Sequence, residues 1–293
     1  MKKVYVFGSL NMDLVITSPR EVLIGETIHG SGFMTNPGGK GANQAAACAK
    51  LGGETLMGGC VGNDDFGARL TKQLSSYGAD VSRVRAIDGV PTGVAVIVVT
   101  DGDNRIILDS GANGQAAFYD ADALLSDAQP GDIFLTQLEN PIPVVGYALR
   151  KAKEKGLVTI LNPAPMNPEI KEYLPYVDIV TPNEGEFVTL AGTENICAGA
   201  ELLASLGIGC TVVTMGSRGY CCCTGEKTIC EDSIKCTPVD TTAAGDTFTG
   251  ALAARLACGD DLEQALHFAN RAAAITVTRP GAQQSIPTLD ELK

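Results

Sequence analysis

The residues best suited to chemistry lie near the C-terminus, in a loop that runs into a helix. Residues 239–253 read Val-Asp-Thr-Thr-Ala-Ala-Gly-Asp-Thr-Phe-Thr-Gly-Ala-Leu-Ala, and their alanine-rich half predicts a helix that continues to about Ala257. The free N–H groups and the partial positive charge at a helix start attract anions, and Gly245 would let a phosphate approach the backbone closely. Asp246 is then either a cap of this helix or a general base beside the phosphate.

The segment Asp-Thr-Thr-Ala-Ala-Gly-Asp-Thr-Phe at residues 240–248 resembles the C-terminal signature of the ribokinase family of sugar kinases. The resemblance implies that Asp246 takes the proton from a sugar hydroxyl. It also implies that the backbone of Ala244, Gly245 and Asp246 forms an anion hole for the transferred phosphoryl group. The match is longer and more specific than a lone glycine motif.

Polar residues near the N-terminus suit a hydroxyl-rich ligand. The apolar strand predicted over residues 4–7 ends before Asn11 and Asp13, and ligands of open α/β sheets gather beyond the carboxyl ends of strands. An Asx turn is the alternative. A glycine-rich turn then enters an alanine-rich helix, where Lys40 and Asn43 could donate hydrogen bonds to sugar oxygens. The alternative there is a flexible turn before a core helix.

Both N-terminal segments, Gly-Ser-x-Asn-x-Asp and Gly-Gly-Lys-Gly-Ala-Asn-Gln-Ala, also resemble the ribokinase family. No Gly-x4-Gly-Lys-Ser/Thr phosphate loop occurs in the chain. The resemblance implies that the sugar, expected to be ribose, is contacted by Asn11, Asp13, Gly39, Lys40, Asn43, Glu139 and Asp246.

The nucleotide side of the site is expected at the ends of later strands. Asn183-Glu-Gly-Glu186 resembles the family motif that arranges magnesium and phosphate, with Glu186 acting on Mg²⁺ indirectly, although helix capping is the alternative. The stretch after the strand at residues 210–214 resembles the family's ATP loop, although by itself it would pass for a hairpin turn. The ATP contacts that the resemblance implies are Asn183, Thr214, Met215, Gly216, Ser217, Arg218, Gly219, Gly245 and Asn270.

A monovalent-cation site is also implied by the resemblance. Backbone carbonyls with one carboxylate suit potassium, so the side chains at most of these positions carry little information. The residues that would hold K⁺ are Asp240, Thr242, Thr276, Arg279, Gly281 and Ser285.

The elements that must position these residues alternate along the middle of the chain. Strand patterns at residues 132–139, 157–164, 177–183 and 210–214 are separated by helical patterns such as residues 143–155 and 198–206. This alternation predicts a three-layer α/β/α fold with a mostly parallel central sheet. We expect one ribokinase-like domain over residues 1–293.

Two segments fall outside the alternation and predict a small β-sheet lid. Residues of about 14–35 lack helical periodicity, and residues 90–108 alternate around the turn Asp-Gly-Asp-Asn at 101–104. A small sheet with an apolar face needs cover, so we expect the lid to close over the sugar and to carry a homodimer contact.

Composition narrows the class of protein. A formal charge of −12, from 22 basic and 34 acidic residues, argues against nucleic acid as a partner. No apolar run is long enough to span a membrane, and the start Met1-Lys2-Lys3 lacks a signal-peptide pattern, so a cytoplasmic location is expected. The ten cysteines show no paired framework, and we expect them to be small buried hydrophobes.

The function expected from the sequence is phosphoryl transfer from MgATP to a sugar hydroxyl, with O5 of D-ribose as the acceptor and K⁺ as an activator. One alternative is a kinase of the same fold for another pentose, a ketose or a nucleoside. A catalytically silent sugar or nucleotide sensor is the other.

Overall fold

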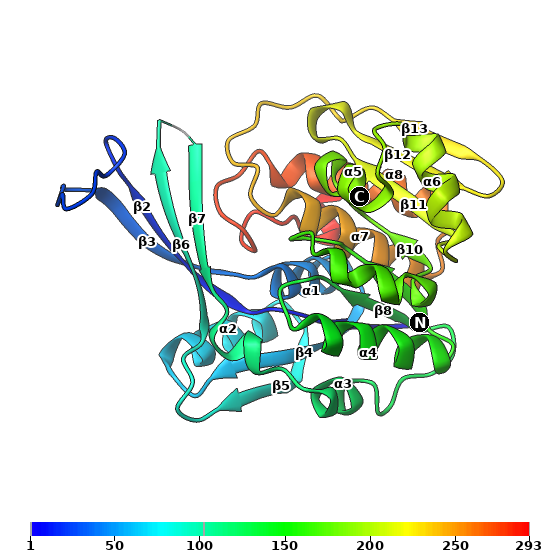
Figure 1. Ribbon diagram of the computed structural model, residues 1–293, viewed down its shortest axis with the longest axis horizontal. Coiled ribbons are helices and arrows are strands. Elements are labelled where there is room, and N and C mark those ends of the chain that lie inside the picture. The colour runs from blue at the N-terminus through cyan, green and yellow to red at the C-terminus, as the bar shows by residue number, and fades with distance from the viewer. Residues whose placement is uncertain (1, 102, 293) are drawn as a thin grey trace.

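The computed structural model describes residues 2–101 and 103–292. Within them the body of the protein is a nine-stranded sheet covered by helices on both faces, and a smaller sheet stands away from it on one side (Figure 1). In spatial order the strands of the body are β13 (Thr228–Glu231), β12 (Tyr220–Thr224), β11 (Cys210–Thr214), β10 (Ile179–Val180), β9 (Val158–Leu161), β8 (Ile133–Thr136), β1 (Lys3–Phe7), β4 (Glu54–Gly62) and β5 (Asp80–Ile87).

The seven strands from β11 to β5 are mutually parallel, and only β12 and β13 run antiparallel to their neighbours. The predicted three-layer fold with a mostly parallel sheet is therefore confirmed. The helices are α1 (Lys40–Lys50), α2 (Asp65–Ser76), α3 (Phe118–Leu124), α4 (Ile142–Glu154), α5 (Glu184–Ala191), α6 (Ile196–Ser205), α7 (Ala244–Cys258) and α8 (Leu262–Thr276), with 3₁₀ turns η1 (Gly111–Gln115), η2 (Pro168–Tyr176), η3 (Gly216–Arg218) and η4 (Leu289–Leu292).

Strand β1 shows how the two cores are divided. Its side chains alternate, so Val4 and Val6 pack with α1, α2, α7 and α8, whereas Tyr5 and Phe7 pack with α3, α4, α5 and α6. All four side chains are fully buried. Because the parallel strands end at one edge, the residues that follow β1, β8, β9, β10 and β11 come together there.

Helices α1 and α7 pack against each other through small side chains. Ala42, Ala47 and Ala251 are buried at this contact, and a Cβ at Gly250 would meet Cβ of Ala47 at 2.6 Å. The Sγ atom of Cys48 also donates to the carbonyl of Gly250 over 3.1 Å. The close approach brings the first turns of the two helices within side-chain reach of each other.

The smaller sheet is the expected lid. Its strands lie in the order β3 (Ser31–Gly38), β2 (Asn11–Thr17), β6 (Gly93–Thr100) and β7 (Asp103–Asp109). Strand β2 pairs in parallel with β6, which joins the two predicted segments in one sheet. Gly102, in the predicted turn, lies outside the described residues. Asn11 and Asp13 lie on β2 itself, so the polar residues expected after β1 begin the lid.

The cysteines depart from the expectation of small buried hydrophobes. Cys221 on β12 lies opposite Cys230 on β13, and the two form a disulfide with their Cα atoms 4.1 Å apart. Cys197 and Cys236 are exposed. The prediction was wrong for these four residues. The disulfide was missed because the sequence pattern did not show that a second strand would pair with residues 220–224.

None of the helices in the described part of the chain is long and apolar enough to cross a membrane.

Candidate active site

Asp246 lies in the first turn of α7, but it does not cap the helix. Ala243 is the N-cap, with a left-handed φ of 61°. The Asp246 side chain instead crosses to α1, where its Oδ2 accepts from Nδ2 of Asn43 and its Oδ1 accepts from Nε2 of Gln44, both over 2.9 Å. The capping alternative is therefore wrong, and the carboxylate is held among side chains of another helix.

The backbone beside Asp246 suits an anion. The first N–H groups of a helix have no partner within the helix and carry partial positive charge. Gly245 is exposed, and nothing lies within 4 Å of the position that its Cβ would take. Ala243, with its left-handed φ, precedes this turn, and the N–H of Ala244 donates to the carbonyl of Thr241 over 3.3 Å. Of the three residues expected in the anion hole, a phosphoryl group would therefore fit best against Gly245 and Asp246.

Asn43 has one polar atom left for a ligand. Its Nδ2 is used by Asp246, while its Oδ1 is buried and has no hydrogen-bond partner among the described residues. An unpaired buried acceptor costs free energy unless a ligand or water satisfies it. A sugar hydroxyl is a fitting donor.

Asp13 is the most perturbed acid near the site. Its carboxylate lies directly over Gly38, where a Cβ would collide with it. Burial, with smaller contributions from the nearby carboxylates of Glu139 and Asp246, raises the pKa of Asp13 from 3.8 to about 7. Such a carboxylate, 9% exposed, is a strong acceptor for sugar hydroxyls.

Glu139 and Lys40 lie beside each other. Oε2 of Glu139 accepts from the backbone N–H of Lys40 over 3.1 Å, from the Ser9 hydroxyl and from Nδ2 of Asn11 over 3.4 Å. Burial disfavours the charged form of Lys40, but the carboxylates of Asp246, Glu139 and Glu186 outweigh burial and raise the Lys40 pKa. The ammonium group is therefore charged and is suited to a phosphate.

Asn11 is oriented by Asn113, a residue that the sequence analysis did not single out. Nδ2 of Asn113 donates to Oδ1 of Asn11 over 2.7 Å, and Oδ1 of Asn113 accepts from the backbone N–H of Leu10 over 3.0 Å. Since its oxygen is occupied, the amide nitrogen of Asn11 faces Glu139 and a cavity of about 370 Å³ that Asn11 and Glu139 both line.

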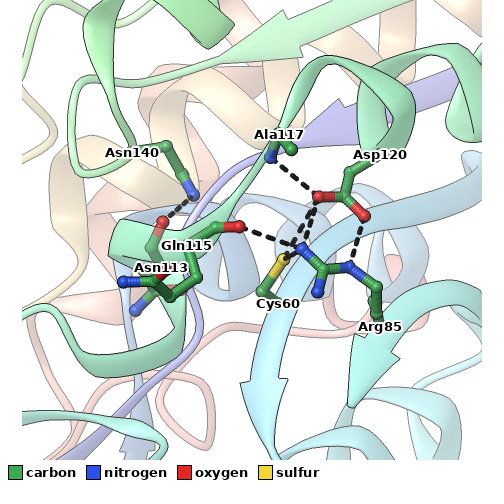
Figure 2. A network of polar contacts seen from close by, with 7 residues as sticks. All are labelled: Cys60, Arg85, Asn113, Gln115, Ala117, Asp120 and Asn140. Atoms are coloured by element: carbon green, nitrogen blue, oxygen red, sulfur yellow. Dashed lines mark hydrogen bonds and ion pairs between the residues drawn. The ribbon is translucent and has the colours of Figure 1, made fainter. Parts of the chain in front are cut away.

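A polar network fixes the turn that carries Asn113 (Figure 2). Nδ2 of Asn140 donates to the carbonyl of Asn113 over 3.2 Å, and Nη2 of Arg85 donates to the carbonyl of Gln115 over 2.9 Å. Arg85 also forms a two-pronged ion pair with the buried carboxylate of Asp120, over 2.7 and 2.9 Å. That pairing raises the pKa of Arg85. The network anchors η1 between β5 and α3 and so supports Asn11 indirectly.

A second cavity, of about 410 Å³, lies beside the start of α7, where Ala244 and Gly245 line it. It is flanked by an apolar wall that includes Ile234, Phe248 and Val277, and by Cys236 and Lys235, which no sequence motif had indicated. Of the residues expected to contact ATP, those that line the cavity are Thr214, Gly216, Ser217, Gly219, Gly245 and Asn270.

Three residues that were expected to contact ATP do not line that cavity: Asn183, Met215 and Arg218. Arg218 pairs with Glu184, and the partly buried Met215 side chain packs against the core on the face of the sheet covered by α3, α4, α5 and α6. Asn183 and Glu186 cap α5 reciprocally: Oε2 of Glu186 accepts from the N–H of Asn183 over 2.9 Å, and Oδ1 of Asn183 accepts from the N–H of Glu186 over 2.8 Å. Burial raises the pKa of Glu186 despite these bonds and the nearby Lys40.

Asp240 joins the two segments of the expected cation site. Its Oδ1 accepts from the N–H of Thr242 and its Oδ2 from the N–H of Gly281, both over 2.9 Å. Burial opposes ionisation, but these hydrogen bonds outweigh it and lower the pKa of Asp240. Elsewhere in the two segments, the Thr276 hydroxyl donates to Thr247, the Ser285 hydroxyl to the carbonyl of Ala282, and Arg279 pairs with Glu291.

The chain belongs to the pfkB family of carbohydrate kinases, whose sequence profile matches residues 1–289. It is therefore a kinase, as the resemblance implied. Within the family it is 40% identical to a ribokinase of Schizosaccharomyces pombe, over 100% of this chain and 97% of the relative, and 38% identical to a ribokinase of Bacillus subtilis, over 100% and 99%. The solved structure of an Arabidopsis thaliana ribokinase complexed with ribose and ATP superposes with a TM-score of 0.92 at 34% identity, over 99% of this chain and 97% of that one.

Proposed function

We propose that this protein transfers the γ-phosphoryl group of ATP to O5 of D-ribose, giving ribose 5-phosphate. The observation that supports the proposal best is the place of Asp246. Its carboxylate lies at the N-terminus of α7, next to the cavity that Gly245 lines and within hydrogen-bond distance of Asn43 on the sugar side. The ribokinase relatives and the complex of the Arabidopsis protein with ribose and ATP support the choice of ribose and ATP.

In the proposed reaction the sugar lies between Asp13 and Asp246. Asp13, Asn11 and Glu139 bind ring hydroxyls, and Asn43 accepts one through its unpaired Oδ1. Asp246 takes the proton of O5 as that oxygen attacks the phosphoryl group, a step that contributes roughly 10²–10⁴-fold. The N–H groups at the start of α7 stabilise the charge on the transferred group, and Lys40 helps to neutralise it.

Magnesium would enter bound to the nucleotide. Among the described residues no three acidic, histidine or cysteine side chains are grouped as an ion site, and Mg²⁺ commonly uses one or two carboxylates with phosphate oxygens and water. Glu186, which faces Lys40 and Asp246, fits the indirect role implied for it. When bound with the nucleotide, Mg²⁺ would supply positive charge that offsets the charge of the phosphate groups.

A substrate panel tests the proposed function. ADP release is measured with ribose, deoxyribose, fructose and adenosine at equal concentrations. We expect the highest kcat/KM for ribose. A higher kcat/KM for another acceptor would identify that sugar or nucleoside as the substrate. Binding of sugar and ATP without any turnover would support the silent-sensor alternative.

Potassium should activate the enzyme. We propose that K⁺ binds carbonyl oxygens of the segments that Asp240 joins, which include Thr242, Thr276, Arg279, Gly281 and Ser285. An ion there would order the loop from Asp240 to Gly245 and so align the N–H groups that face the phosphoryl group. We expect KCl, titrated into Tris or choline buffer at fixed ionic strength, to raise kcat about several-fold with little change in sugar KM. An equal response to choline chloride would exclude the site.

The lid supports a proposal about assembly. Large apolar side chains are exposed on its strands β3 and β7, among them Phe33 (65%), Met34 (51%), Ile106 (56%) and Ile107 (71%). We propose that the lid segments, about residues 14–35 and 90–108, close over the sugar and meet the lid of a second copy.

Sedimentation velocity at micromolar concentration should therefore show a dimer. Ile107→Lys should shift the equilibrium to monomer, because it would bury an unpaired charge at the contact. Lys72→Ala, on the exposed face of α2, is the control. A monomer for the unaltered chain would contradict the lid contact.

A further inference from the structure

Gln44 touches the proposed base but has no assigned role. It lies on α1, one residue after Asn43, and is completely buried. Its Nε2 donates to Oδ1 of Asp246 over 2.9 Å and to Oδ1 of Asn162 over 3.1 Å. Asn43 and Gln44 thus hold the two oxygens of one carboxylate, one each.

The carboxylate dictates the orientation of three neighbouring amides. Because a carboxylate can only accept hydrogen bonds, the nitrogen of Gln44 faces Asp246 and the oxygen of Gln44 faces the other way. That oxygen accepts from Nε2 of Gln137 over 2.6 Å. Asn162 likewise turns its oxygen to Gln44 and its nitrogen to the carbonyl of Thr181, over 2.8 Å. Each amide has one orientation that satisfies this chain of bonds.

Gln137 is held only through its nitrogen. Its Oε1 is buried without a hydrogen-bond partner among the described residues and lies against Gly8, where a Cβ would collide with it. The bond from Gln137 to Gln44 therefore fixes both amides. Gln137 follows β8 directly and is 1% exposed, so it has little room to turn away.

We propose that Gln44 is a positioning residue for Asp246, and that the bond from Gln137 supports the orientation that the carboxylate imposes on the Gln44 amide. This inference rests on the proposed function, in which Asp246 is the general base. By holding Oδ1, Gln44 fixes the plane of the carboxylate, so that its remaining lone pairs point at the sugar hydroxyl. Misplacement of a catalytic group by about 1 Å can cost roughly 10²-fold in rate.

Removing the Gln44 amide should lower turnover without weakening binding. For Gln44→Leu, which keeps the volume of the side chain, we expect kcat to fall at least about tenfold while the KM values for ribose and ATP stay within about threefold. A raised KM with an unchanged kcat would overturn the proposal. Thermal unfolding and ATP binding, both measured by calorimetry, show whether the variant is folded.

Gln137 offers a sharper test because it does not touch Asp246. In Gln137→Glu, the new carboxylate would attract the nitrogen of Gln44 and turn its oxygen toward Asp246, where two acceptors repel. Gln137→Leu removes the donor without demanding that rotation. We expect kcat of Gln137→Glu to be at least about fivefold below that of Gln137→Leu. Equal kcat values would overturn the proposal, even if Gln44→Leu fails to fold.

A double-mutant comparison separates the amide's orientation from a direct effect of charge. In the Gln44→Leu background there is no amide to rotate. The kcat values of Gln137→Glu and Gln137→Leu should therefore differ by no more than about twofold. An undiminished difference in kcat would mean that the charge at position 137 acts on Asp246 directly, which would overturn the role proposed for Gln137. Absence of turnover by the unaltered protein would instead overturn the proposed function and, with it, the role of Gln44.

Discussion

Asp246→Asn should lower kcat for ribose by at least about two orders of magnitude and leave the sugar KM within about threefold. The amide has nearly the size of the carboxylate, so the first turns of α1 and α7 can keep their packing. It cannot accept the proton of the attacking hydroxyl. The measurement is steady-state ADP release at saturating ATP, with the sugar concentration varied.

A matched control lies just beyond the other end of the same helix. Asp260 pairs with Arg255 over 2.7 Å, outside the site, and Asp260→Asn makes the same chemical change there. Its kcat should stay within about threefold of the parent, because it loses only a partly exposed ion pair. If Asp246→Asn also stays within that range, Asp246 is not the base.

Asp13→Ala should raise the KM for ribose at least about tenfold and leave the KM for ATP nearly unchanged, since a hydrogen bond to a charged group contributes roughly 1.5–3 kcal/mol. Asp13 lies on lid strand β2, whereas the cavity proposed for ATP is lined from β11, α7 and α8. Asp103→Ala, an equal loss of charge at the exposed end of β7, is the control. Equal effects of Asp13→Ala on both KM values would point to misfolding.

The pKa of Asp13 also predicts an effect on stability. A carboxyl whose pKa rises from 3.8 to about 7 on folding is favoured in its neutral form, so its contribution to stability is present below about pH 4 and is lost as the pH rises to about 7. Above that pH the buried charge costs about 4 kcal/mol. Asp13→Asn should therefore unfold at a higher temperature than the parent at pH 8, and the gap should narrow toward pH 5. A gap that does not depend on pH would contradict this explanation.

Local patterns were sufficient for most of the fold. The apolar runs at residues 4–7 and 210–214 became β1 and β11, because short runs with polar ends suit strands buried on both faces. The alanine-rich sequence after Gly245 became α7. What local patterns could not show is which strands meet, and for that reason the disulfide between Cys221 and Cys230 was missed.

Motifs indicated the residues of the proposed site but not the side chains with which they pair. Asp246 and Asn43 were indicated by motifs, yet the sequence placed Asn43 against the sugar alone, whereas its nitrogen is bound to Asp246, 203 residues away. Gln44 adjoins a motif residue, and only the close packing of α1 on α7 brings it to Asp246. The wall at residues 233–238 has no regular secondary structure and no motif, so only the structure reveals it.

The acidity of the sugar side bears on how the product departs. In the proposed site, ribose enters as a neutral molecule and meets Asp13, Glu139 and Asp246, with Lys40 as a counter-charge. After transfer, the same pocket holds a phosphate ester with roughly two negative charges. Like charges at short range repel, most strongly where water is excluded. Carboxylates that bind the neutral sugar therefore repel its phosphate ester. The charge gained in the reaction itself favours release of the product.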